Sequence, residues 1–241
     1  MSSEKNYKDI AAELKAKNVK LLAVSKTKPN EAILALHAQG QRRFGENYPQ
    51  ELVEKYESLP KNIEWHLIGS LQSNKVKYIA PFVSMIHSID SLKLLQEINR
   101  QALKHKRKIN CLLEFKIGTE AGKHGFTEAE ARFMLNSEEF HMLGNVKICG
   151  VMGMASFTED REQVRSEFKE LMRIFNSLKT DYFIDKSYFE EISMGMSGDY
   201  DMAIEEGSTM VRIGSLLFGA REKVEKPVKA PKPVVEDDDD F

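Results

Sequence analysis

The feature that most constrains the fold of this chain is a regular alternation of short apolar segments with longer amphipathic segments. A short apolar run without polar alternation is typical of a strand buried on both faces, and apolar residues at helical spacing predict an amphipathic helix. We predict strands over residues 20–25, 42–45, 64–68, 85–88, 109–117, 147–151, 191–194 and 210–213. We predict helices over residues 3–17, 31–39, 48–57, 73–80, 91–103, 128–135, 159–178 and 199–206.

Eight strands that alternate with helices predict parallel pairing, because each helix returns the chain to the start of the next strand through a right-handed crossover. The predicted fold is α/β, a single closed (β/α)8 TIM barrel with an extra N-terminal helix, formed by residues 1–221. An open doubly wound sheet is the alternative, since the second and seventh predicted strands are short.

The composition changes after residue 221, where lysine and proline residues are followed by four consecutive aspartates. Such a segment has little apolar surface to bury, so we expect residues 222–241 to form a disordered tail. No second folded domain is predicted.

The composition also excludes several classes of function. A formal net charge of −2 provides no strong positive field, so neither nucleic acid nor a membrane is an expected partner. Cys111 and Cys149 lie in apolar segments without a CxxC pair, which is typical of a reduced cytoplasmic protein without a zinc site. Residues 1–8 lack the apolar core of a signal peptide, and no apolar run reaches the roughly 18 residues of a membrane helix.

Two of the predicted helices begin at recognisable caps. Thr127 and Glu130 have the spacing of a capping box before helix 128–135. Asp90 is the predicted N-cap of helix 91–103.

In a (β/α)8 barrel, active and binding sites lie at the C-terminal ends of the strands. Lys26 follows the first predicted strand, where its stem can lie in apolar surroundings and its amine at the mouth of the barrel. Partial burial disfavours the ammonium form and lowers a lysine pKa, so Lys26 is a candidate nucleophile for an aldehyde. The alternative is an ordinary solvated lysine.

The segments after the seventh and eighth strands predict a phosphate site, because phosphate binds there in many barrels of this type. Their small residues leave backbone N–H groups and serine hydroxyls open to an oxyanion at a helix N-terminus. Taken alone, each segment could equally be a cap and a turn. The candidate ligands are Ser193, Gly195, Met196, Ser197, Gly214 and Ser215.

A nucleophilic lysine opposite a phosphate site describes a cavity for pyridoxal 5′-phosphate (PLP), which carries both an aldehyde and a phosphate. Arg212, on the last predicted strand, could then face the pyridine ring. Arginine is always charged, so it opposes protonation of a neighbouring ring nitrogen and weakens the cofactor as an electron sink. A salt bridge at the barrel rim is the alternative role for Arg212.

Six motifs, in this order, resemble those of the pyridoxal phosphate homeostasis proteins, single-domain relatives of the alanine racemase N-terminal barrel. The resemblance extends over roughly residues 3–221. The motifs are VSKTKP at 24–29, FGENY at 44–48, WHLIG at 65–69, GVMGM at 150–154, SMGMS at 193–197 and VRIGSLLFGAR at 211–221.

The resemblance implies that Lys26 carries PLP as an internal aldimine and that the two small-residue segments hold its phosphate. It implies that Arg212 faces the pyridine nitrogen, that Asn47 and His66 lie near the ring, and that Lys28 assists transfer of the cofactor. Ser215 stands where threonine is common in the family, but the hydroxyl is kept.

The family is regarded as non-catalytic, and the sequence suggests a reason. Racemisation needs a base on each face of the cofactor, and alanine racemases take the second base, a tyrosine, from another domain. Because only the predicted tail follows the barrel here, we expect a protein that binds PLP for its homeostasis, is a monomer, and supplies PLP-dependent apoenzymes. The alternative is a weak PLP-dependent amino-acid racemase that uses Tyr48.

Overall fold

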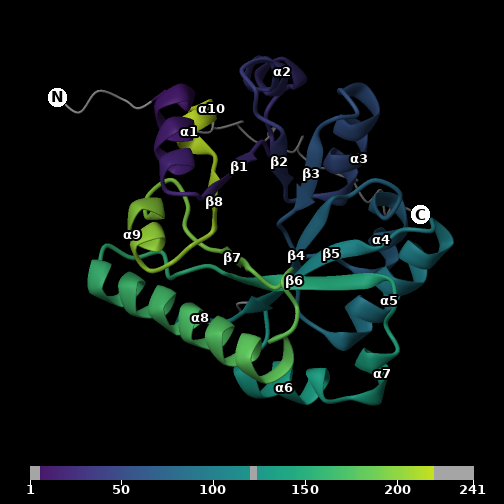
Figure 1. The fold of residues 1–241 in the computed structure, drawn as a ribbon. Coiled ribbons are helices and arrows are strands. Elements are labelled where there is room, and N and C mark those ends of the chain that lie inside the picture. Colours follow the sequence, from purple (N-terminus) through teal and green to yellow (C-terminus); the bar gives the residue numbers. More distant parts are fainter. Residues whose placement is uncertain (1–5, 120–123, 220–241) are drawn as a thin grey trace, which may run out of the picture.

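The strands form a closed parallel barrel in the order β1 to β8, with β8 paired to β1 (Figure 1). The computed structural model describes residues 6–119 and 124–219. The predicted closed barrel is confirmed and the open sheet is excluded. The strands are β1 (Lys20–Val24), β2 (Arg43–Glu46), β3 (Glu64–Leu67), β4 (Met85–Ile89), β5 (Ile109–Phe115), β6 (Val146–Gly153), β7 (Glu191–Ser193) and β8 (Met210–Ile213).

Helices surround the barrel, and the long helix α8 crosses beneath β6 and β7 in the view of Figure 1. Each predicted helix has a counterpart, but residues 73–80 form a 3-10 turn followed by a short α-helix. Helices α7 and α10 were not predicted. The helices are α1 (Tyr7–Ala16), α2 (Asn30–Ala38), α3 (Pro49–Ser58), η1 (Ser73–Lys75), α4 (Val76–Ile79), α5 (Leu92–Lys104), α6 (Glu128–Leu135), α7 (Glu138–His141), α8 (Arg161–Tyr182), α9 (Tyr200–Glu205) and α10 (Ser215–Phe218).

Three expectations involve residues outside the described part of the chain. The predicted first helix includes residues 3–5, and the predicted tail spans residues 222–241. The boundary of the barrel at residue 221 lies there as well, so both the boundary and the tail remain predictions.

The two predicted helix caps had different outcomes. The capping box of Thr127 and Glu130 is confirmed, with Glu130 N–H donating to Thr127 Oγ1 over 3.2 Å. Asp90 is not the N-cap of α5, which was a wrong prediction. Ser91 caps the helix by accepting from Leu94 N–H, and Asp90 instead accepts a hydrogen bond of 3.0 Å from the Ser91 hydroxyl.

The inside of the barrel contains an apolar layer made of Met85, Leu112, Cys149 and Met152. Cys149 is a free thiol, and burial raises its pKa to about 11. This layer fills the barrel below the C-terminal ends of the strands, which leaves those ends as the place for a cavity.

Between β6 and β7 the backbones approach each other closely at Gly150. Its φ is +153°, and a Cβ atom built there would lie 1.8 Å from the carbonyl oxygen of Glu191. Only glycine fits this contact, which accompanies the irregular register between β5 and β6.

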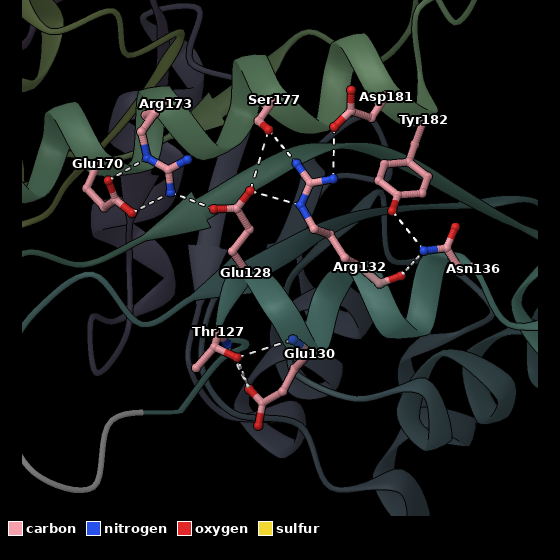
Figure 2. A network of polar contacts seen from close by, with 10 residues as sticks. All are labelled: Thr127, Glu128, Glu130, Arg132, Asn136, Glu170, Arg173, Ser177, Asp181 and Tyr182. Atoms are coloured by element: carbon pink, nitrogen blue, oxygen red, sulfur yellow. Dashed lines mark hydrogen bonds and ion pairs between the residues drawn. The ribbon is translucent and has the colours of Figure 1, made fainter.

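Helices α6 and α8 are joined on the outside by a network of polar contacts (Figure 2). Glu128 on α6 accepts from Arg132 over 2.9 Å and from Arg173 on α8 over 2.5 Å, and Arg132 also reaches Asp181 over 2.8 Å. Exposed ion pairs of this kind contribute roughly 0–1 kcal/mol each. The network therefore joins the two helices with a modest gain in stability. Among the residues that the structure describes, no helix is both long and apolar enough to cross a membrane.

Candidate functional site

A cavity of about 730 Å³ opens at the C-terminal ends of the strands. The site was predicted at this end of the barrel. Of the eleven predicted site residues, eight line the cavity. They are Lys26, Lys28, Asn47, Met196, Ser197, Arg212, Gly214 and Ser215.

Lys26 lies two residues after the end of β1 and is half-buried. The backbone on both sides of it is held by side chains of α3. Lys55 Nζ donates to the carbonyl of Ser25 over 2.7 Å, and the N–H of Thr27 donates to Glu51 Oε1 over 2.6 Å. Thr27 has a φ of +63°, which is rare for a branched residue. These contacts fix the direction in which Lys26 leaves the barrel wall.

Behind this turn, Lys55 forms a buried ion pair with Glu46 at the end of β2. Lys55 Nζ lies 2.8 Å from Glu46 Oε1 and 2.7 Å from Glu51 Oε1, and the Ser25 hydroxyl donates to Glu46 over 2.5 Å. Burial raises the pKa of Glu46, although Lys55 opposes this shift. The pair thus forms a rigid polar base for the Lys26 turn.

The two small-residue segments contact each other at the cavity. Gly214 N–H donates to the Ser197 hydroxyl over 3.2 Å, and Met196 N–H donates to the carboxylate of Asp199. Gly195 does not line the cavity. Its φ is +90°, and a Cβ atom there would lie 2.5 Å from Ala203 Cβ, so glycine serves local packing at this position.

Arg212 extends from β8 across the barrel interior. Its Nη1 donates to the carbonyl of Ser193 over 2.7 Å and to the Ser193 hydroxyl over 2.8 Å, and its Nη2 donates to the carbonyl of Gly153 over 3.0 Å. Burial lowers the pKa of Arg212 to about 10, which still leaves it cationic at neutral pH. Among the described residues Arg212 makes no ion pair, so the rim salt bridge is not observed.

His66 and Ser193, both predicted to meet the cofactor, lie below the cavity surface. His66 Nδ1 is 2.8 Å from His87 Nε2, and His87 Nδ1 is 3.1 Å from Ser193 Oγ. Burial lowers the pKa of His66 to about 3 and that of His87 well below its ordinary value, so both rings are neutral. The Ser193 hydroxyl contacts both Arg212 and His87, so Ser193, His87 and His66 together support Arg212 from beneath.

Several lining residues were not among the predicted ligands. Met154, Phe157 and His124 lie at the cavity, as does Glu114 near the end of β5. Glu114 is the only charged residue in its strand, INCLLEF, and a lone charge in an apolar strand is a signal that could have identified it.

Comparison with known proteins identifies the family of this chain. Residues 2–222 match the family of the alanine racemase N-terminal domain. A pyridoxal phosphate homeostasis protein of Vibrio alginolyticus is 43% identical over 210 residues, which cover 85% of this chain and 88% of the relative. The structure of PipY of Synechococcus elongatus with PLP bound is 33% identical and has a TM-score of 0.77, covering 87% of this chain and 98% of PipY.

An alanine racemase of Clostridium difficile is only 14% identical, with a TM-score of 0.68 over 90% of this chain and 57% of the racemase. This second likeness is one of fold alone. The likeness to the homeostasis protein instead extends over most of both sequences, as the six motifs indicated. The chain therefore belongs to the pyridoxal phosphate homeostasis protein family, within the broader family of the alanine racemase N-terminal domain.

Proposed function

We propose that this protein binds PLP in the cavity, holds it covalently through Lys26, and serves PLP homeostasis as a carrier rather than as an enzyme. The observation that carries the proposal is that Lys26, Arg212 and the two small-residue segments line one cavity. The names of the relatives and the PLP bound to PipY support it.

The residues present fit the chemical groups of this cofactor. Bound PLP supplies an aldehyde that a primary amine can attack, together with a pyridine ring that withdraws electrons and a phosphate. Lys26 is the amine that we assign to the aldehyde, because its backbone is held on both sides and its side chain reaches the cavity.

We assign the phosphate to Met196, Ser197, Gly214 and Ser215. Ser215 begins α10, and the N–H groups of a first helical turn have no acceptor within the helix. A Cβ atom built on Gly214 would lie 3.4 Å from the carbonyl oxygen of Val24. A side chain at this position would therefore contact the backbone of β1. Gly195 and Ser193 support this region from behind.

The remaining predicted ligands receive more limited roles. Arg212 is a fixed cation that opposes protonation of the ring nitrogen, and His66 supports it through His87. Asn47 directly follows β2 and lines the cavity, and we assign it to a contact with the ring. Lys28 Nζ donates to the carbonyl of Phe218 over 2.9 Å, and we propose that it assists transfer from its place beside Lys26.

A carrier role is supported by the side chains at the cavity. Racemisation needs a second base opposite the lysine, and no tyrosine is among the described residues that line the cavity. Tyr48, the candidate for that base, precedes α3, is 59% exposed and does not line the cavity. We further propose that the protein acts as a cytoplasmic monomer that supplies PLP-dependent apoenzymes.

Covalent binding can be tested with borohydride, which reduces the bond between an amine and an aldehyde. The protein is incubated with PLP, freed of excess cofactor and examined in the visible range. We expect an absorbance band that borohydride removes, and mass spectrometry should then locate the adduct on the peptide that contains Lys26. Lys26→Ala should abolish the band, whereas Lys8→Ala, which removes an exposed lysine, should leave it unchanged.

The same preparations separate the carrier from the racemase. Each is incubated with a panel of L-amino acids over days, and the D-isomers are measured by chiral chromatography. We expect no more racemisation than free PLP produces. A band that survives in Lys26→Ala would refute the assignment of the lysine, and racemisation well above the free cofactor would refute the carrier role.

A further inference from the structure

Glu114 is a buried carboxyl group whose role is not explained by the assignments above. It is the only charged residue of β5, it is 5% exposed, and it lines the cavity. Among residues 6–119 and 124–219, no group hydrogen-bonds to its carboxyl or forms an ion pair with it. Because Glu114 lines the cavity, its carboxyl group is available to a ligand that binds there.

The strand order places Glu114 opposite Lys26. In the closed barrel, β5 is four strands from β1 in either direction. Leu112 belongs to the apolar layer inside the barrel, and side chains two residues apart in a strand point to the same face. Glu114 therefore points into the barrel one layer above Leu112, at the floor of the cavity.

The guanidinium of Arg212 lies on the same side of the cavity. Glu114 pairs with Met152 across β5 and β6, and the next residue of β6, Gly153, accepts a hydrogen bond from Arg212 Nη2 over 3.0 Å. Arg212 and Glu114 therefore form adjacent parts of the cavity floor.

The charged groups around Glu114 favour different protonation states. The pKa of Glu114 is raised to about 7, mainly by burial and also by Asp90 after β4, while Arg212 opposes this rise. Lys26, Lys28 and His124 line the same cavity. His87 on β4 is neutral because burial lowers its pKa.

We propose that Glu114 contacts the ring nitrogen of the cofactor beside Arg212 and shares a proton with it. This inference rests on the function proposed above. In PLP the nitrogen lies para to the carbon that bears the aldehyde. A ring held through Lys26 therefore directs its nitrogen toward the opposite side of the cavity, where Glu114 lies.

The proton balance of this contact is simple. A protonated Glu114 donates its O–H to a neutral ring nitrogen, and an ionised Glu114 accepts from a protonated one, so one proton is shared in either form. Arg212 alone disfavours a protonated ring, whereas an ionised Glu114 favours it. The electron-withdrawing strength of the ring then depends on the carboxyl as well as on the arginine.

The contact can be tested with a probe that binds without a covalent bond. 4′-Deoxypyridoxine 5′-phosphate has a methyl group in place of the aldehyde, and its 1-deaza analogue has C–H in place of the ring nitrogen. Dissociation constants are measured by calorimetry between about pH 6 and pH 8 for the wild type, for Glu114→Gln and for the exposed-site control Glu57→Gln. Glu114→Gln resembles the protonated acid in shape and cannot ionise.

For the first probe, we expect the dissociation constant of Glu114→Gln divided by that of the wild type to be near one at the acidic end. It should rise roughly three- to tenfold at the alkaline end, where only the wild type can offer a carboxylate to a protonated nitrogen. For the 1-deaza analogue, and for Glu57→Gln with either probe, the ratio should not rise.

A ratio that does not change with pH for the first probe would overturn the inference. A ratio that rises equally for both probes would also overturn it, because the contact would then not involve the nitrogen. If the wild type binds neither probe, the proposed function itself fails. Circular dichroism checks that each variant folds. Glu114→Asp keeps the acid but shortens it by one methylene group. At the alkaline end, its dissociation constant for the first probe should lie between those of the wild type and Glu114→Gln.

Discussion

At the residue scale, burial decides the charge of the groups around the cavity. It holds His66 and His87 neutral by lowering their pKa values, and it leaves Arg212 cationic with a pKa of about 10. Glu114, with its pKa raised to about 7, differs from these three because it changes charge near neutral pH. A single carboxyl therefore makes the floor of the cavity sensitive to pH.

This shift predicts how the stability of the cofactor-free protein depends on pH. The folded state raises the pKa of Glu114 from 4.5 to about 7, so Glu114 contributes stability that is fully present below the lower value and lost as the pH rises to the upper one. Glu114→Gln, which cannot ionise, should match the wild type near pH 4. It should be more stable by up to roughly 3 kcal/mol near pH 8.

Urea unfolding at a series of pH values measures this difference, and the exposed Glu57→Gln variant is the control for a general effect of charge. A difference between Glu114→Gln and the wild type that stays constant across the pH range would show that Glu114 titrates normally in the folded protein.

At the element scale, helix α3 holds the backbone on both sides of Lys26. Its Lys55 and Glu51 hold the carbonyl of Ser25 and the N–H of Thr27, on either side of Lys26. Lys55 is 5% exposed and its partner Glu46 is fully buried. The geometry of the β1–α2 turn therefore depends on a buried ion pair in the neighbouring β/α unit.

Removal of this lysine should both destabilise the protein and loosen the turn. Lys55→Met leaves Glu46 buried without its cation, which typically costs about 3–5 kcal/mol in unfolding free energy. Denaturant unfolding measures this loss, and the rate at which the PLP absorbance band forms should fall as well. Lys17→Met, which removes an exposed partner of Glu13, should cost less than about 1 kcal/mol and leave the rate unchanged.

The double variant Lys55→Met/Glu46→Gln no longer contains an unpaired buried charge, so it should recover part of the lost stability. Its rate of band formation should stay low, because Ser25 still lacks the lysine contact. A normal rate in either variant would show that Lys55 does not position Lys26.

At the scale of the whole molecule, closure of the barrel joins distant parts of the sequence. β1 pairs with β8 from Lys20 opposite Met210 to Ala23 opposite Ile213. Figure 1 shows β1 beside β8 in the closed barrel. Lys26 follows the first strand, whereas Ser197 and Gly214 follow the last two. A ligand that contacts all three binds only the closed barrel, so its binding is coupled to global unfolding.

We therefore expect PLP to raise the melting temperature. At a free concentration about one hundred times the dissociation constant, linkage adds about 2.7 kcal/mol, or roughly 5–10 °C for a domain of this size. Differential scanning calorimetry measures the shift. Lys26→Ala should reduce it, and pyridoxal without the phosphate should produce less of it. An equal shift in Lys26→Ala would indicate that PLP stabilises the protein through other sites.

Much of the fold was predictable because its signals are local. The strand over residues 210–213 was predicted with its observed bounds, and α6 likewise. The break between η1 and α4 was not predicted, since 3-10 and α geometry in such short helices depend on tertiary packing rather than on periodicity. Asp90 and Ser91 are adjacent and both are favourable N-cap residues, so the sequence alone did not show that Ser91 would cap α5.

The sequence by itself determined that strands and helices alternate, that the strands are parallel, and which residues stand at the strand ends, because these properties follow from periodicity and chain order. It also selected Lys26 and the two small-residue segments, whose residues Met196, Ser197, Gly214 and Ser215 line one cavity with Lys26. Only the tertiary structure decided that Ser193 and His66 support Arg212 from below, and that Glu114 faces Lys26 across the cavity. The physical reason is that contacts across a barrel depend on closure and register, which bring together side chains that no local pattern relates.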